Sequence, residues 1–151
     1  MLFRSLDMLR YHRFLIGAQW VGEYGSPENP VHFAWLRAYS PYHNVREGER
    51  YPAVYLFAAA ADIRVDALHA RKMAALLQTA SGSGLPVLLR VEDRVGHGAG
   101  KPLARVIEER VEIWTFLAWQ LGLPVATGRM ESTRKAPGEE PLGDRGGAEL
   151  S

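Results

Sequence analysis

The chain contains no cysteine, which excludes every site that depends on a thiol. Disulfide frameworks, cysteine-bound zinc and a cysteine nucleophile are all ruled out. Long apolar runs are also lacking, since no stretch approaches the ~20 residues of a membrane-spanning helix. The N-terminal segment does not have the pattern of a signal peptide, because it is interrupted by Arg4, Asp7, Arg10 and Arg13. We therefore expect no membrane association and a cytoplasmic location.

An excess of charge of either sign is missing as well. The 18 basic and 17 acidic residues give a formal net charge of +1. Nucleic acids usually select a strongly basic surface, so they are not expected as partners. The histidines show no HxxxH or HExxH spacing, so we expect neither a metal site nor a cofactor. Four of them are expected on helix surfaces or in loops, namely His12, His32, His43 and His69.

The apolar residues that are present indicate one α/β domain. Hydrophobic residues make up 47% of the 151 residues, enough for a sizeable core. Helical spacing predicts helices over residues 6–18, 29–39, 67–80 and 102–121. We expect Asn29 to cap the second helix with Pro30 in its first turn, and Asp66 to cap the third. The last helix carries an apolar stripe of Leu103, Val106, Ile107, Val111, Trp114, Leu117 and Leu121.

Two short apolar runs, residues 53–61 and 86–92, indicate buried strands. Their alternation with helices predicts parallel strands flanked by helices. Two strands make a poor sheet on their own, so this segment resembles one end of a larger α/β sheet. We expect an exposed sheet edge, low stability and possible self-association. The domain is expected to span 1–123, and the Gly- and Pro-rich residues 124–151 are expected to form a disordered tail.

Two polar residues follow these strands, where ligands and catalytic groups lie in open α/β sheets. Asp62 follows the first strand, and His97 follows the second within "RVGHGAGKP". A carboxylate beside an imidazole is the orienting half of a nucleophilic triad. Alternatively, Asp62 is a turn residue and His97 a plain loop residue. A phosphate-binding loop is disfavoured, because Val95 stands where that motif needs glycine and Pro102 where it needs Ser or Thr.

Longer stretches point to a family. The segments "YPAVYLFAAAADIRVDALHARKMAALLQTA" and "PVLLRVEDRVGHGAGKPLARVIEERVEIWTFLAWQLGL" strongly resemble the C-terminal end of the prolyl oligopeptidase family of serine peptidases. Upstream, "DMLRYHRFLIGAQWVGEYGSPENP" and "FAWLRAYSPYHNV" resemble the same family in the same order. The resemblance runs from about Asp7 to Leu123. It implies the C-terminal portion of an α/β-hydrolase fold and cleavage of short peptides after proline.

The resemblance also implies roles for six residues. Asp62 corresponds to the triad acid and His97 to the triad base. Arg64 corresponds to the arginine that holds a substrate carbonyl group. Trp20, Tyr24 and Val65 correspond to the walls of the pocket for the substrate proline, and Trp20 is the residue that stacks on the proline ring. An indole face suits a proline ring because both are flat and apolar.

The nucleophile of the family has no counterpart in this sequence. A GxSxG elbow presents the serine in these hydrolases, and none of the seven serines has that setting. Ser5 stands where the family has an apolar pocket residue. We therefore expect the isolated chain to be inactive as a peptidase. The alternative is a non-catalytic remnant, or a module that binds proline-containing peptides weakly.

Overall fold

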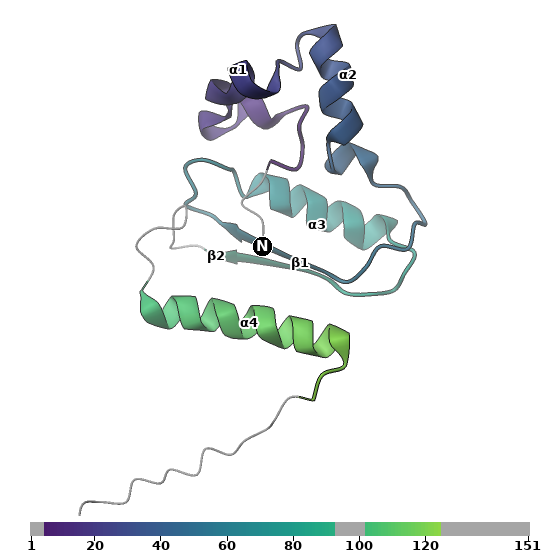
Figure 1. The fold of residues 1–151 in the computed structure, drawn as a ribbon, viewed down its shortest axis with the longest axis vertical. Coiled ribbons are helices and arrows are strands. Elements are labelled where there is room, and N and C mark those ends of the chain that lie inside the picture. Colours follow the sequence, from purple (N-terminus) through teal and green to yellow (C-terminus); the bar gives the residue numbers. More distant parts are fainter. Residues whose placement is uncertain (1–4, 93–101, 125–151) are drawn as a thin grey trace, which may run out of the picture.

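A computed structural model describes residues 5–92 and 102–124 (Figure 1). Their elements are η1 (Tyr11–Arg13), η2 (Leu15–Trp20), α1 (Val21–Tyr24), α2 (Pro30–Tyr39), η3 (Tyr42–Asn44), β1 (Val54–Ala59), α3 (Leu68–Ala80), β2 (Val87–Glu92) and α4 (Leu103–Leu121), where η denotes 3-10 helix. Among these residues no helix is long and apolar enough to cross a bilayer. The tail expected over 124–151 lies outside the described residues, apart from Pro124.

The two strands lie at the centre of the molecule and are parallel, as predicted. Their register runs from Val54 opposite Val87 to Ala59 opposite Glu92. Figure 1 shows α3 on one face of this sheet and α4 on the other, with α1 and α2 beyond α3. The α/β character expected from the sequence is therefore confirmed. Parallel strands need a crossover connection, and α3 provides it between β1 and β2.

Helix α3 packs closely on the sheet because its buried side is made largely of small residues. The buried positions are His69, Ala70, Ala74, Leu77 and Ala80. One core cluster joins Ala74 to Leu56 of β1 and to Leu6 near the N-terminus. A second cluster, Met8, Tyr11 and Leu36, holds the N-terminal segment together. The segment before β1 therefore has a small core of its own and a separate contact with α3.

Helix α2 begins as the sequence predicts. The side-chain oxygen of Asn29 accepts hydrogen bonds from the backbone N–H groups of Val31, at 2.9 Å, and His32, at 3.4 Å. Pro30 is the first residue of the helix, where it needs no hydrogen-bond donor. The predicted cap of the third helix differs by one residue. The residue directly before α3 is Ala67, which makes no side-chain cap bond, but Asp66 accepts a hydrogen bond from Leu68 N–H at 2.8 Å.

The cap of α2 can be tested by replacing Asn29 with alanine. The Asn29→Ala substitution leaves two N–H groups of the first turn without their acceptor and is expected to lower the free energy of unfolding by about 1 kcal/mol. Urea denaturation followed by circular dichroism measures this difference. Gln19→Ala, which removes an exposed amide elsewhere, is the matched control. Equal stability of the Asn29→Ala variant and the wild type would contradict the assignment.

The expected helix over 6–18 is wrong. The chain instead forms η1 and η2, separated by Phe14 in an extended conformation. Leu15 adopts a positive φ of 49°, and a Cβ atom on Gly17 would lie only 2.0 Å from the carbonyl oxygen of Tyr11. The turn is thus too tight for a continuous α-helix. The Tyr11 hydroxyl donates to the Gly25 carbonyl at 2.7 Å, so a tertiary contact replaces the periodic pattern.

Helix α4 contacts the sheet through its less apolar side. The Tyr55 hydroxyl donates to Glu112 at 3.0 Å, Arg90 pairs with the same carboxylate, and the rings of Tyr55 and Phe116 are 5.4 Å apart. Burial, with the bond to Glu112, raises the pKa of Tyr55 to about 12. A cavity of ≈ 1080 Å³ remains between β2 and α4, lined by residues that include Leu88.

The apolar stripe of α4 is largely exposed, although its spacing is that of a buried face. We use "outer stripe" for Leu103, Ile107, Val111, Trp114 and Leu121, whose exposed fractions lie between 54% and 73%. On a helical wheel Leu103, Ile107, Trp114 and Leu121 lie opposite Glu112 and Phe116, which face the sheet. Val111 lies at the side and also lines the cavity between β2 and α4. No residue of α4 is buried. The outer stripe therefore has no partner within the described residues.

Candidate functional site

Both candidate catalytic residues follow strands that end side by side. Ala59 and Glu92 are paired in the register, and Ala60 N–H donates to the Glu92 carbonyl at 2.8 Å. The carboxyl ends of β1 and β2 therefore lie side by side in the sheet. Asp62 lies in the first loop. His97 lies outside the described residues, so the structure describes one member of the expected pair.

The carboxylate of Asp62 is buried and organises the loop after β1. Only 4% of the residue is exposed. Its Oδ1 atom accepts hydrogen bonds from Arg64 N–H at 2.8 Å and from Val65 N–H at 3.1 Å. This is the geometry of a turn residue, which was the alternative to a catalytic acid. The two roles are compatible, because a triad acid also needs to be held rigidly.

Three of the predicted pocket residues line one cavity. Its volume is ≈ 440 Å³, and it is formed by Ser5, Leu6, Met8, Trp20, Tyr24, Tyr39, Pro41 and Val65. We call it the aromatic cavity. The rings of Trp20 and Tyr24 meet edge to face, with centroids 6.3 Å apart. The structure thus brings Trp20 and Tyr24 together with Val65, which comes from the loop that Asp62 organises.

Arg64, the fourth residue predicted to contact the substrate, precedes Val65 in the sequence but does not line the cavity. Its side chain is exposed, and no hydrogen bond or ion pair of its guanidinium is found within residues 5–92 and 102–124. An exposed guanidinium can present its donors to a ligand carbonyl group without first breaking an internal contact. Ser5 adds a hydroxyl group to the wall of the aromatic cavity.

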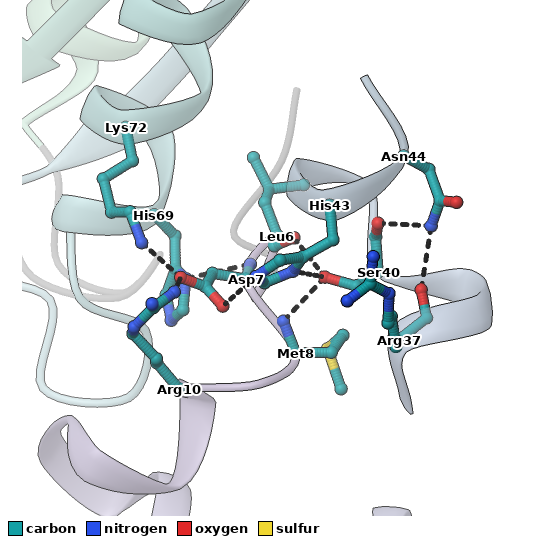
Figure 2. Close-up of polar contacts among 10 residues, drawn as sticks. All are labelled: Leu6, Asp7, Met8, Arg10, Arg37, Ser40, His43, Asn44, His69 and Lys72. Atoms are coloured by element: carbon teal, nitrogen blue, oxygen red, sulfur yellow. Dashed lines mark hydrogen bonds and ion pairs between the residues drawn. The ribbon is translucent and has the colours of Figure 1, made fainter. Parts of the chain in front are cut away.

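The cavity-lining residues Leu6 and Met8 flank Asp7, which is the centre of a buried polar cluster that the sequence reasoning missed (Figure 2). Asp7 is 1% exposed, and its Oδ2 atom binds Lys72 and, at 2.9 Å, Arg10. Burial alone would raise the pKa of this carboxyl group. The hydrogen bonds from Lys72 and Arg10 outweigh burial and hold the pKa below its ordinary value. Asp7 is therefore a buried anion with two cationic partners.

Two histidines complete this cluster. The backbone N–H of Asp7 donates to Nδ1 of His69 at 3.2 Å, so that nitrogen carries no proton. His43 places Nδ1 2.8 Å from the Ser40 hydroxyl and Nε2 3.8 Å from Oδ1 of Asp7. Burial lowers the pKa of both histidines, and the attraction of Asp7 offsets this only in part. Both are therefore neutral at neutral pH.

The expectation that His69 lies on a helix surface is wrong, since only 3% of the residue is exposed. It faces Asp7 instead of solvent, and the reason is tertiary, because its partner lies 62 positions earlier. One signal of this contact was available in the sequence. His69 and Lys72 are three residues apart and therefore share a face of α3, from which both contact Asp7.

Ser40, His43 and Asp7 resemble a Ser–His–Asp arrangement but cannot act as one. Ser40 is completely buried, so no substrate can reach its hydroxyl group. Its oxygen accepts Met8 N–H at 3.0 Å and lies 3.3 Å from the Leu6 carbonyl. These contacts identify the group as structural. Within residues 5–92 and 102–124, no cluster of three His, Asp or Glu side chains is placed to hold a metal ion.

The lowered pKa values of His43 and His69 lead us to expect that the free energy of unfolding falls at acidic pH. In the unfolded chain they bind protons as the pH falls through about 6.5, whereas their lowered pKa keeps them neutral in the folded chain. The unfolded state then binds more protons, so the free energy of unfolding decreases below about pH 6.5. Urea denaturation at pH 7.5 and pH 5.5 measures this decrease. His69→Asn keeps an acceptor near the Nδ1 position and is expected to reduce the slope. An unchanged slope in this variant would contradict the assignment to His69.

Comparison with known proteins gives a consistent result. The sequence pattern of the prolyl oligopeptidase family matches residues 5–124. A prolyl endopeptidase from Elizabethkingia miricola is 39% identical over 119 residues, covering 78% of this chain and 17% of that protein. A prolyl oligopeptidase from Omphalotus olearius is 41% identical over 133 residues, covering 85% and 18%. This chain thus spans less than a fifth of the length of these relatives.

Solved structures agree with the sequence matches. One chain from a study of two prolyl endopeptidases superposes with a TM-score of 0.76 at 46% identity, covering 80% of this chain and 18% of the other. Prolyl oligopeptidase B from Galerina marginata, bound to a 35-residue substrate for hydrolysis and macrocyclization, superposes with a TM-score of 0.73 at 35% identity, covering 79% and 17%.

Proposed function

The chain belongs to the prolyl oligopeptidase family of peptidases, with the C-terminal portion of an α/β-hydrolase fold, and from this premise we propose that it supplies the acid, the base and the proline pocket of a serine peptidase that cleaves short peptides after proline. Asp62 is the acid that orients His97, and His97 is the general base that takes a proton from the serine. Arg64 donates to a carbonyl group of the bound peptide.

The observation that carries this proposal is the aromatic cavity beside the Asp62 loop. Oδ1 of Asp62 accepts the backbone N–H of Val65, and Val65 lines the same cavity as Trp20 and Tyr24. A peptide whose proline ring rests against Trp20 would thus have its next peptide bond close to the loop of the acid. The proline pocket and the catalytic acid are adjacent because Oδ1 of Asp62 binds the backbone of Val65, which forms part of the pocket wall.

The serine must come from a polypeptide segment with a GxSxG elbow, because the 151 residues contain none. We propose that the chain by itself is inactive as a peptidase and binds proline-containing peptides weakly. We also propose that it self-associates, because two apolar features are left uncovered among the described residues. The edges of the two-stranded sheet are open, and the outer stripe of α4 is exposed. A second candidate function is a peptide-binding module without catalysis. It is favoured by the fact that the aromatic cavity is formed entirely by residues of this chain.

Peptide binding tests the proposal directly. N-acetyl-Gly-Pro-amide is expected to bind the chain with a dissociation constant of about 1 mM, and Trp20→Ala is expected to weaken binding about tenfold because the stacking face is lost. Saturation-transfer NMR measures both values. Trp35→Ala removes an exposed tryptophan on α2 and serves as the control. Equal affinity of the wild type and the Trp20→Ala variant would refute the assigned pocket.

A further inference from the structure

The back wall of the aromatic cavity is built around a buried charge. Leu6 and Met8 both line the cavity, whereas the residue between them, Asp7, does not. The carboxylate of Asp7 lies in the polar cluster instead (Figure 2). Since Leu6 and Met8 are joined directly to Asp7 in the chain, the position of Asp7 constrains where its two neighbours lie. The contacts of Asp7 with Lys72 and Arg10 therefore fix the back wall.

The opposite wall is attached to the same cluster. Tyr39 and Pro41 line the cavity, and the residue between them is the buried Ser40. The Ser40 hydroxyl oxygen accepts Met8 N–H at 3.0 Å and lies 2.8 Å from Nδ1 of His43. The two walls are thus joined by hydrogen bonds, and not only by apolar contact.

A third connection leads from this cluster to the loop of the proposed catalytic acid. His69 and Lys72, which bind the backbone and the carboxylate of Asp7, both belong to α3. Helix α3 follows directly after the loop that contains Asp62 and Val65. Asp7 therefore provides the charged contact between the segment carrying Trp20 and Tyr24 and the body that carries the acid, beside the apolar contact of Leu6 with Ala74.

A buried carboxylate is a precise anchor. Its energy depends strongly on keeping its cationic partners at hydrogen-bond distance, because an unpaired charge in the interior is costly. An apolar contact of the same size would tolerate sliding by a fraction of an ångström. The back wall is therefore held in one position by a directional contact.

We propose that Asp7 is a positioning residue for the aromatic cavity, whose ion pair with Lys72 on α3 sets the distance between the Trp20–Tyr24 wall and the Asp62–Val65 loop. The identity of the ligand rests on the function proposed above, whereas the positioning itself does not. Asp7 touches no ligand in this proposal. It acts through Leu6 and Met8.

Hydrogen–deuterium exchange of the full chain tests the positioning. In Asp7→Asn, amides within residues 6–24 are expected to exchange at least tenfold faster, while those of β1 and β2 keep the wild-type rate. Glu47→Gln removes an exposed carboxylate and is expected to change neither. Faster exchange throughout the chain would show a purely structural role and overturn the proposal, as would an unchanged rate over residues 6–24.

A double variant separates positioning from simple charge neutralisation. Asp7→Asn combined with Lys72→Met removes the less exposed of the two cations next to the new amide, and the remaining cation, Arg10, has a half-exposed side chain. We therefore expect the melting temperature to move back towards the wild type. Fast exchange over residues 6–24 is nevertheless expected to remain, because the anchor is still missing. Recovery of both stability and slow exchange would overturn the proposal. The double variant also carries the test if the single variant does not fold.

Peptide binding adds a functional measurement. We expect Asp7→Asn and the double variant to bind N-acetyl-Gly-Pro-amide at least tenfold more weakly than the wild type and Glu47→Gln. Wild-type affinity in the double variant would overturn the proposal. If the wild type itself binds no such peptide, the proposed function fails, while the exchange rates still decide the role of Asp7.

Discussion

Incubated with a chromogenic Gly-Pro substrate, the 151-residue chain is expected to release no product above the buffer rate. Loss of the nucleophile from a serine triad lowers kcat by about 10⁶-fold, since the base and acid then have no hydroxyl group to activate. The sequence has no serine in an elbow, and Ser40, which does contact a histidine, is completely buried. Spectrophotometric release of the chromophore measures this rate.

A fluorophosphonate probe provides the control for this prediction. The wild type and a His97→Ala variant are expected to remain equally unlabelled, because no activated serine is present in either. Labelling of the wild type that is lost in His97→Ala would contradict the prediction and show that one of the serines of this chain serves as the nucleophile. Labelling that survives His97→Ala would indicate reaction at a site unrelated to the triad.

Self-association through α4 is the second large effect that we expect. The outer stripe exposes Ile107, Val111 and Trp114 together, and a patch of this kind is typical of an interface. Burying about 150 Å² of one tryptophan contributes roughly 4 kcal/mol at about 25 cal/mol per Å². Ile107→Lys combined with Trp114→Lys is therefore expected to raise the dissociation constant of the oligomer by at least about 100-fold. Sedimentation velocity over a concentration series measures this constant.

The matched control is Trp35→Lys, which adds the same charge at an exposed tryptophan on α2. We expect this variant to associate as the wild type does. If the open edges of β1 and β2 mediate association instead of α4, the Ile107→Lys and Trp114→Lys variant will keep the wild-type mass. A wild type that sediments as a monomer at every concentration would refute self-association altogether.

Much of the fold could be predicted because it depends on local patterns. The cap of α2 at Asn29 with Pro30 in the first turn follows from two adjacent residues and is confirmed. The parallel pairing of β1 and β2 follows from the alternation of strands and helices. The failure at residues 6–18 has an equally clear place, since Phe14 is extended and Leu15 has a positive φ, which break the helical backbone. Periodicity cannot report such a break.

The candidate site divides in the same way. Asp62 could be identified from its place after a strand, and the six site residues from the resemblance of their surrounding motifs to a family. Asp7 carried no such signal. It stands among arginines in a segment that predicts a helix, and its partner Lys72 lies 65 positions away. The buried role of His69 was missed because its partner lies 62 positions earlier in the chain.

The sequence by itself determined the elements, the parallel order of the strands and the membership of a family, because each of these depends on neighbouring residues or on the order of motifs. Only the tertiary structure decided that Trp20, Tyr24 and Val65 line one cavity. It also decided that a buried anion lies between two residues that line the cavity and that the apolar stripe of α4 points away from its own sheet. These features depend on which side chains come into contact although they lie far apart in the sequence. Such contacts decide whether a buried charge is paired and whether an apolar side chain is covered, and local sequence does not.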